Sequence, residues 1–245
     1  MVTPRDVLAA MIKCCDLGQN LLELSSLDFE HRVVDPLADA GLDFYFDTGA
    51  SKGVLIFDEF VIKVPFMARS WDSEQYARDL EAYDRGSKSA EPMIENYLAP
   101  FCQAKNFLLE TENEWDYCEL ECAMYQQAVR EGLEAYFAKE CLLGEVRGYP
   151  VYVQQLVVPF EEATSSRVSR STPEALRSTE EMCDKNDIWC FNVEWITDFI
   201  LAYGEDEFKR LDKFLKKMYI SDLHRGNVGY FNGYPILLDY SNYNE

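Results

Sequence analysis

The sequence predicts an α+β protein in which an antiparallel sheet dominates the first half and helices dominate the second. Short runs rich in aromatic and β-branched residues occur at 43–66 and 142–160, a composition typical of strands. Longer stretches with apolar residues at helical spacing lie between and after them. Near the C-terminus, two short apolar runs flank Asn232-Gly233, a favoured two-residue hairpin turn.

The composition is that of a globular chain with an unusual charge. With 245 residues, of which 48% are hydrophobic, the chain is long enough for one two-lobed domain or two small ones. The formal net charge of −21 argues against a nucleic-acid or anionic-membrane surface, because phosphate binding needs clustered Lys and Arg. We interpret the charge as a solubility feature; an acidic face that mimics DNA or meets a basic partner is the alternative.

The cysteines indicate a reducing environment. Eight are present, none forms a CxxC pair, and neither of the two histidines lies near enough to suggest a zinc site. There is no signal peptide and no apolar run of membrane-spanning length. Scattered thiols without a leader predict a cytoplasmic protein that does not bind a membrane.

The first 40 residues are expected to form a helical extension packed on the domain. Thr3 before Pro4, with Asp6 three residues on, is a plausible helix start within 3–25. Its apolar stripe is interpreted as core and consists of Val7, Leu8, Met11, Ile12 and Cys15.

Three strands are predicted next, at Phe44–Phe46, Val54–Phe57 and Phe60–Val64. The segment DTGASKG (47–53) lies between the first two and predicts a glycine loop, although a plain hairpin turn has the same composition.

Residues 67–115 read as an insert, with a helix at 70–86, a loop, and a second stretch that is either helical or irregular. A strong helical pattern at 116–138 has Leu120, Met124, Ala128 and Leu133 on one side, and Gly132 suggests its end. Two strands within 142–160 are joined at 147–150.

The Ser/Thr-rich segment 161–179 predicts a flexible loop leading into a helix from Pro173. Helices are expected at 189–203 and 205–218, before the final hairpin of Val228–Phe231 and Ile236–Leu238.

The stretch SDLHRGNVGYFNGYPILLDYS concentrates polar groups in a chain that has two histidines. Asp222, His224 and Asn227 lie in an apparent loop, and Asp239 ends the hairpin that follows. Elsewhere, Lys63 lies in an apolar strand, where an ammonium is unfavourable unless it is paired or bound to phosphate.

This pattern resembles the catalytic loop of the protein-kinase-like superfamily, nearest to its aminoglycoside and choline phosphotransferase branch. That branch has Asp-x-His-x-x-Asn followed by a hairpin that ends in Asp and an aromatic residue, here Asp239-Tyr240. The resemblance covers roughly 43–66 and 116–241. It implies a two-lobed kinase-like fold with an antiparallel-sheet N-lobe at 41–158, an insert at 67–115, and a reduced, mainly helical C-lobe at 159–245.

The resemblance also implies roles for single residues. Asp222 would orient the attacking hydroxyl as the catalytic residue, while Asn227 and Asp239 would bind Mg²⁺ through oxygen atoms. His224 would brace the loop; a buried, hydrogen-bonded histidine is the structural alternative.

Lys63 would contact the nucleotide phosphates and pair with a helix glutamate. We assign that glutamate to Glu121, with Glu119 as the near alternative and Glu74 or Glu81 if the earlier helix takes this place.

The remaining implied contacts are to ATP. Backbone N–H groups of the glycine loop would cap the phosphates, and Lys52 would add charge there or be solvated. The segment after the fifth strand would hold adenine. The residues assigned to nucleotide are Gly49, Ser51, Lys52, Gly53, Lys63, Gln155, Leu156 and Val157.

The chain departs from the family in having no Asp-Phe-Gly sequence and in ending at Glu245, before the helices that build the acceptor site in known kinases. We therefore expect an ATP- and Mg²⁺-dependent kinase acting on a protein Ser/Thr or a small molecule, with protein favoured. A homo-oligomer or a partner chain would complete the lower lobe. The alternatives are a catalytically inactive kinase-like scaffold with an acidic interaction surface, and transfer of a nucleotidyl group.

Overall fold

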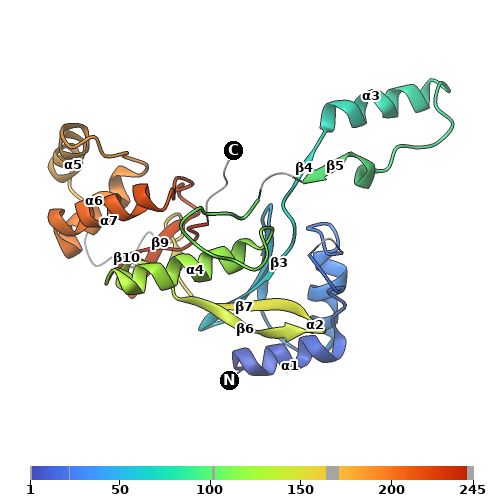
Figure 1. Cartoon of the computed structure of the whole chain (residues 1–245), viewed down its shortest axis with the longest axis horizontal. Helices are drawn as coiled ribbons and strands as arrows, with labels where there is room; N and C mark the ends of the chain where they lie inside the picture. The colour runs from blue at the N-terminus through green and yellow to red at the C-terminus, as the bar shows by residue number, and fades with distance from the viewer. Residues whose placement is uncertain (1, 22, 101–102, 164–170, 242–245) are drawn as a thin grey trace.

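The computed structural model describes residues 2–21, 23–100, 103–163 and 171–241, which fold as a mixed α+β protein. This confirms the predicted class. Figure 1 shows a strand-rich part, a helix-rich part and an arm that stands away from both.

A five-stranded antiparallel sheet forms the centre of the strand-rich part (Figure 1). The strand order is β1-β2-β3-β7-β6. The bounds are Tyr45–Thr48 for β1, Lys52–Ile56 for β2, Phe60–Pro65 for β3, Tyr149–Gln155 for β7 and Glu140–Val146 for β6. β6 and β7 are joined by Arg147 and Gly148, whose positive φ angles suit a tight turn between twisted strands.

Lys52 and Gly53 extend β2 towards the turn, so the connection after β1 is shorter than the expected glycine loop. β1 ends at Thr48 and β2 starts at Lys52, and the backbone N–H of Gly49 donates to the carbonyl of Lys52 at 2.9 Å. The connection is therefore a hairpin turn of residues 49–51.

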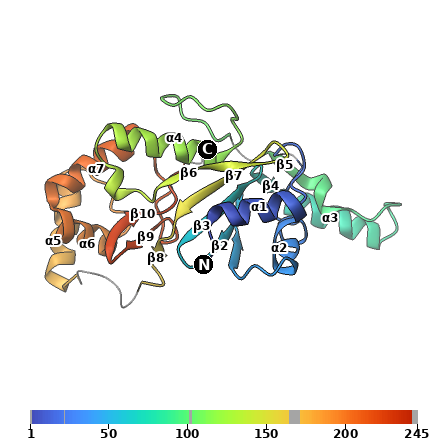
Figure 2. The same cartoon turned by 90° about the horizontal axis from the view of Figure 1, so that it is seen from below.

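Helices cover both faces of this sheet (Figure 2). α1 (Pro4–Cys14), the π-helical turn η1 (Glu30–Val34) and α2 (Asp35–Asp39) lie on one side, and α4 (Tyr117–Arg130) lies on the other. Thr3 caps α1 as predicted, with its hydroxyl accepting from the N–H of Asp6.

The N-terminal helix is shorter than the predicted span of 3–25. α1 ends at Cys14 because Cys15 has an extended backbone, and Gly18 has a φ of +86°. Val7, Met11 and Cys15 are buried as expected, but Ile12 is 48% exposed, so it does not belong to the core stripe.

α4 confirms the helix predicted at 116–138, although it ends earlier, at Arg130, and it contributes to a second hydrophobic core. It ends close to Gly132, whose φ is +66°, and the short 3-10 helix η3 (Glu134–Tyr136) follows. Leu120, Met124 and Ala128 are fully buried in the second core.

The helix-rich part surrounds a three-stranded sheet of order β10-β9-β8. The strands are β8 (Val158–Pro159), β9 (Val228–Phe231) and β10 (Tyr234–Leu237), and the helices are α5 (Pro173–Lys185), α6 (Val193–Tyr203) and α7 (Glu205–Lys217). The predicted Asn232-Gly233 turn is confirmed by its two positive φ angles. β8 was not predicted, and residues 164–170 of the Ser/Thr-rich segment lie outside the described residues.

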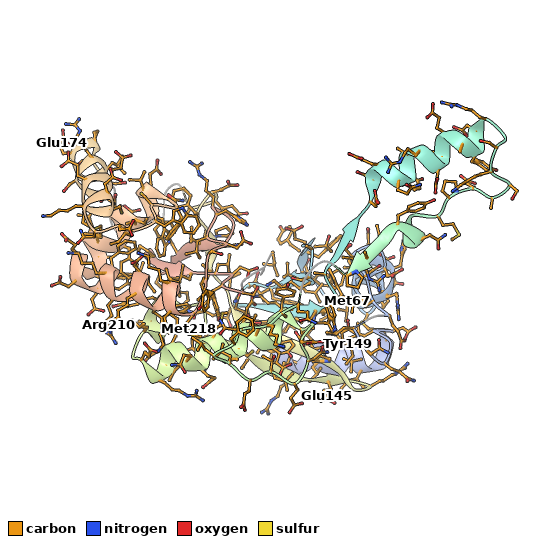
Figure 3. The ribbon with its side chains drawn as sticks, turned by 45° about the horizontal axis from the view of Figure 1, so that its top comes forward. Met67, Glu145, Tyr149, Glu174, Arg210 and Met218 are labelled. Carbon is orange, nitrogen blue, oxygen red and sulfur yellow. The ribbon has the colours of Figure 1, made fainter. Side chains whose placement is uncertain are left out.

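Part of the predicted insert, residues 69–100, forms the arm that Figures 1 and 3 show standing clear of both cores, whereas Ala68 and Ala104 are buried in the second core. A two-stranded ribbon of β4 (Arg69–Trp71) and β5 (Leu98–Pro100) carries α3 (Ser73–Asp84) and the 3-10 helix η2 (Ile94–Tyr97). α3 confirms the first predicted helix, and none of its described residues is buried. Of the helices described, none has the length and apolar character to cross a membrane.

Candidate functional site

The sheet has one apolar face and one polar face. Side chains alternate along a strand, so Ile62 and Val64 of β3 pack under α1 and α2 while Lys63 points to the side of α4. Lys63 pairs in register with Tyr152 of β7, and Glu140 of β6 pairs with Gln154. Polar side chains from several strands therefore gather beneath α4.

Glu121 of α4 lies directly above this polar face and binds two lysines. Its Oε2 is 2.6 Å from the Nζ of Lys63, and its Oε1 is 2.5 Å from the Nζ of Lys52. All three side chains are at least 92% buried. Lys52 is thus ion-paired inside the protein, so the alternative that it is simply solvated is wrong.

The other candidate glutamates lie elsewhere. Glu119 accepts hydrogen bonds from the backbone N–H groups of Glu112 and Asn113. Glu74 and Glu81 are on the exposed helix of the arm. Of these candidates, Glu121 is therefore the one that pairs with Lys63.

Glu140 and Gln154 belong to the site and were not predicted. Glu140 Oε2 lies 2.7 Å from Lys63 Nζ and accepts from Gln154 Nε2 at 2.9 Å. Gln154 Nε2 also donates to the carbonyl of Leu238 at 2.9 Å, which ties the sheet to the segment after β10. A Glu at the start of an apolar run gives no sign of its partner until the strand register is known.

The carboxylates keep both lysines charged. Burial by itself would lower the pKa of Lys52, but Asp239 and Glu121 outweigh it and raise that pKa well above its ordinary value. Burial also opposes the charge of Lys63, and Glu121 and Glu140 again raise its pKa overall.

Cys118, Glu121 and Glu140 have ligand atoms within 4.8 Å of one another, but they fit a metal ion poorly. The ammonium of Lys63 already bridges the two carboxylates. Burial raises the pKa of the Cys118 thiol well above its ordinary range, whereas a thiol must lose its proton to bind a metal. We interpret this group as part of the ion-pair cluster.

Asp239 joins the same cluster from the end of the last hairpin. Its Oδ2 is 2.9 Å from Lys52 Nζ, and its side chain is 26% exposed, whereas those of Glu121 and Glu140 are fully buried. Burial raises the pKa of Asp239, and the nearby Glu121 raises it further. Tyr240, the next residue, is buried and donates its hydroxyl hydrogen to the carbonyl of Ala138 at 2.8 Å.

The loop before β9 is fastened to Asp239 through Asn227. The carbonyl of Asn227 accepts from the N–H groups of Leu238 (2.9 Å) and Asp239 (3.2 Å). The side-chain Nδ2 of Asn227 donates to the carbonyl of Asp222 at 2.6 Å, so the Oδ1 of Asn227 takes no part in that contact. The side chain of Asp222 is 36% exposed.

His224 is not buried, so the structural alternative for this residue is wrong. Its side chain is 63% exposed, and its Nδ1 accepts from the N–H of Gly226 at 3.0 Å, a contact that braces the loop.

The residues assigned to nucleotide lie at several places. Gly49 is at the exposed hairpin turn, while Ser51 is fully buried and its carbonyl accepts from the N–H of Phe66. Gly53 packs against Phe29, whose ring would be 2.4 Å from an added Cβ. Close packing with Phe29 is therefore a sufficient reason for glycine at position 53.

Gln155, Leu156 and Val157 form the connection from β7 to β8. The N–H of Gln155 donates to the carbonyl of Lys139, and Val157 is buried against the strand that contains Gly229.

The comparisons with known proteins place the chain in no group: no family model, no curated protein and no solved structure matches it. Its function must be inferred from the site.

Proposed function

We propose that the protein is an ATP- and Mg²⁺-dependent phosphotransferase with a kinase-like two-lobed fold. The observation that carries this proposal is one ion-pair cluster. Glu121 of α4 pairs with Lys63 of β3 and with Lys52, and Lys52 also pairs with Asp239 after β10. A strand lysine held by a helix glutamate, beside an aspartate from a C-terminal hairpin, is the arrangement that phosphoryl transfer uses to position phosphates.

The two hydrophobic cores support the two-lobed interpretation. One core lies between the five-stranded sheet and the N-terminal helices, and the other lies among α4, α6, α7 and the last hairpin. The cluster lies where α4 and the segment after β10 meet the polar face of the sheet. In this interpretation, the nucleotide binds at the junction between the lobes.

The residues assigned to Mg²⁺ fit that ion in donor type. Asp239 offers a carboxylate and Asn227 offers its side-chain carbonyl, which are the hard oxygen donors that Mg²⁺ prefers. The ammonium of Lys52 lies 2.9 Å from Asp239, so Mg²⁺ would reach this carboxylate only after that ammonium has moved. When bound, Mg²⁺ would neutralise developing charge on the phosphates.

The chain's own residues supply the rest of the chemistry. Lys63, fixed by two buried carboxylates, presents a positive charge to a phosphate oxygen. Asp222 is exposed enough to meet an acceptor hydroxyl, which it orients and whose proton it accepts. Asn227 holds the Asp222 backbone in position through its 2.6 Å hydrogen bond.

The acceptor is a hydroxyl of a protein Ser/Thr or of a small molecule. Its site would be built from the 67–115 insert, the 161–204 segment, the N-terminal helices or a second chain. The Ser/Thr-rich loop 163–179 is a candidate for autophosphorylation, with a plain linker as the alternative.

The test compares ATP binding and turnover in Asp222→Asn and in wild type. Thermal unfolding with ATP, with and without Mg²⁺, should show stabilisation of both proteins, because Asp222 does not hold the nucleotide. ATP hydrolysis and phosphoryl transfer, followed by mass spectrometry, should fall about 10²–10⁴-fold in the variant, as expected for loss of a general base.

Asp58→Asn is the matched control, because it removes an exposed carboxylate from the β2–β3 turn and should leave turnover unchanged. Asp239→Asn should lose the Mg²⁺-dependent part of the stabilisation. If millimolar ATP does not stabilise the wild type, the phosphotransferase proposal fails and the inactive scaffold becomes the better interpretation.

A further inference from the structure

The two lysines of the cluster are held unequally. Lys63 lies between two carboxylates that are fully buried, those of Glu121 and Glu140. Lys52 shares Glu121 but has Asp239 as its second partner, and Asp239 is 26% exposed. A cation arriving from solvent therefore meets Asp239 first among these carboxylates, and it finds Lys52 already there.

Lys52 is also placed so that its ammonium can move without disturbing the sheet. It is the first residue of β2, next to the exposed turn at Gly49 and Ala50. Its backbone is fixed by the strand pairing with Pro65 and by the hydrogen bond from Gly49, while its charge is at the end of a flexible four-carbon chain. The strand pairing therefore does not depend on where the ammonium lies.

We propose that Lys52 is a built-in, exchangeable counter-cation that occupies Asp239 and keeps the metal position closed until a nucleotide phosphate draws the ammonium away. This proposal deepens the proposed function and rests on it for the identity of the nucleotide. The cluster contains three carboxylates and two ammonium groups. When no nucleotide is bound, the two ammonium groups balance most of the negative charge of the carboxylates. The consequence is that Mg²⁺ and nucleotide bind together and that Mg²⁺ by itself binds weakly.

The first experiment measures Mg²⁺ affinity in the absence of nucleotide by calorimetry and by thermal unfolding. Lys52→Met should bind Mg²⁺ at least about tenfold more tightly than wild type, which corresponds to about 1.4 kcal/mol. Lys52→Arg keeps the positive charge and should bind Mg²⁺ as weakly as wild type. Lys63→Met makes the same change of charge in the same cluster but leaves Lys52 on Asp239, so it should show no such gain.

The double variant Lys52→Met/Asp239→Asn tests whether the gain depends on Asp239. The gain should disappear, because the carboxylate that Lys52 had covered is neutral. If Lys52→Met is unfolded without metal, Mg²⁺ should restore its native far-UV circular dichroism, while Na⁺ at equal ionic strength should not.

The proposal is overturned if Lys52→Met binds Mg²⁺ no better than wild type, or if it is unfolded and Mg²⁺ does not restore it. It is overturned equally if the gain persists in the double variant or occurs to the same extent in Lys63→Met, since either result would be a general effect of charge. These comparisons use no nucleotide, so they decide the role of Lys52 even if ATP fails to stabilise the wild type.

Discussion

Asp116, at the start of α4, is a buried residue whose charge should oppose folding near neutral pH. It is 1% exposed. Its Oδ1 accepts from the backbone N–H groups of Cys118 (2.9 Å) and Glu119 (3.0 Å), and its Oδ2 accepts from the hydroxyl of Tyr152 (2.7 Å). Burial raises its pKa from 3.8 to about 6, although these hydrogen bonds oppose the change.

The direction of the pH effect follows from that raised pKa. The folded protein holds the proton of Asp116 more tightly than the unfolded chain does. The stability that this group contributes is therefore fully present below pH 3.8 and is lost as the pH rises through about 6. Since one pKa unit corresponds to about 1.4 kcal/mol, the loss approaches about 3 kcal/mol above pH 7.

Asp116→Asn removes the titration and keeps the N-cap, since Asn is as good a capping residue as Asp. The variant keeps the carbonyl that caps Cys118 and Glu119 but replaces the oxygen facing Tyr152 with an amide nitrogen. A change in that hydrogen bond shifts stability by a constant amount. The pH dependence therefore isolates the buried charge.

The assay is urea unfolding, followed by tryptophan fluorescence and circular dichroism between pH 5 and pH 7.5. The range begins at pH 5 because an acidic chain loses net charge and solubility below it. The free energy of unfolding of Asp116→Asn minus that of wild type should rise by about 1.4 kcal/mol across this range.

The control is Asp72→Asn, which makes the same chemical change at the exposed N-cap of α3, where no charge is buried. For Asp116→Asn, a difference that is flat within about 0.3 kcal/mol, or that falls with pH, would refute the reasoning. Such a result would mean that water reaches the carboxylate in the folded protein.

Two further predictions concern packing around the site. Gly53→Ala should destabilise the protein by about 1–3 kcal/mol in urea unfolding, because the new Cβ would meet the ring of Phe29 at 2.4 Å. Gly49→Ala, whose Cβ has 3.7 Å to its nearest neighbour, should change stability by less than about 0.5 kcal/mol, and an equal loss in both variants would contradict the packing argument. Tyr240→Phe should cost about 1–3 kcal/mol by the same measurement, because it leaves the carbonyl of Ala138 without its 2.8 Å hydrogen bond; a neutral result would show that another donor replaces it.

Local interactions made much of the secondary structure predictable. Thr3, Gly132 and the Asn232-Gly233 turn act within a few residues of themselves, and the helices and hairpin that they bound are found close to the expected positions. The end of α1 was missed because apolar residues continue in the sequence beyond Cys14, whereas the backbone becomes extended at Cys15. The two residues of β8 are too few to give a periodic pattern.

The candidate site was predictable in part. Lys63, Asp222, Asn227 and Asp239 stand out in the sequence because each is a polar group in an unusual setting. The sequence favoured Glu121 over Glu119 as the partner of Lys63. The choice between them depends on which face of α4 meets the sheet, and only the structure shows that.

By itself the sequence determined the α+β class, the main helices and strands, and a short list of polar residues, because these follow from periodicity and turn chemistry over a few neighbouring residues. The tertiary structure decided which of those residues meet. Lys52 and Glu121 are 69 positions apart, and Lys63 and Glu140 are 77 apart. Their contacts exist because strand register and helix packing fix which side chains share the buried face. Because these side chains are buried, they stay charged only when they are paired.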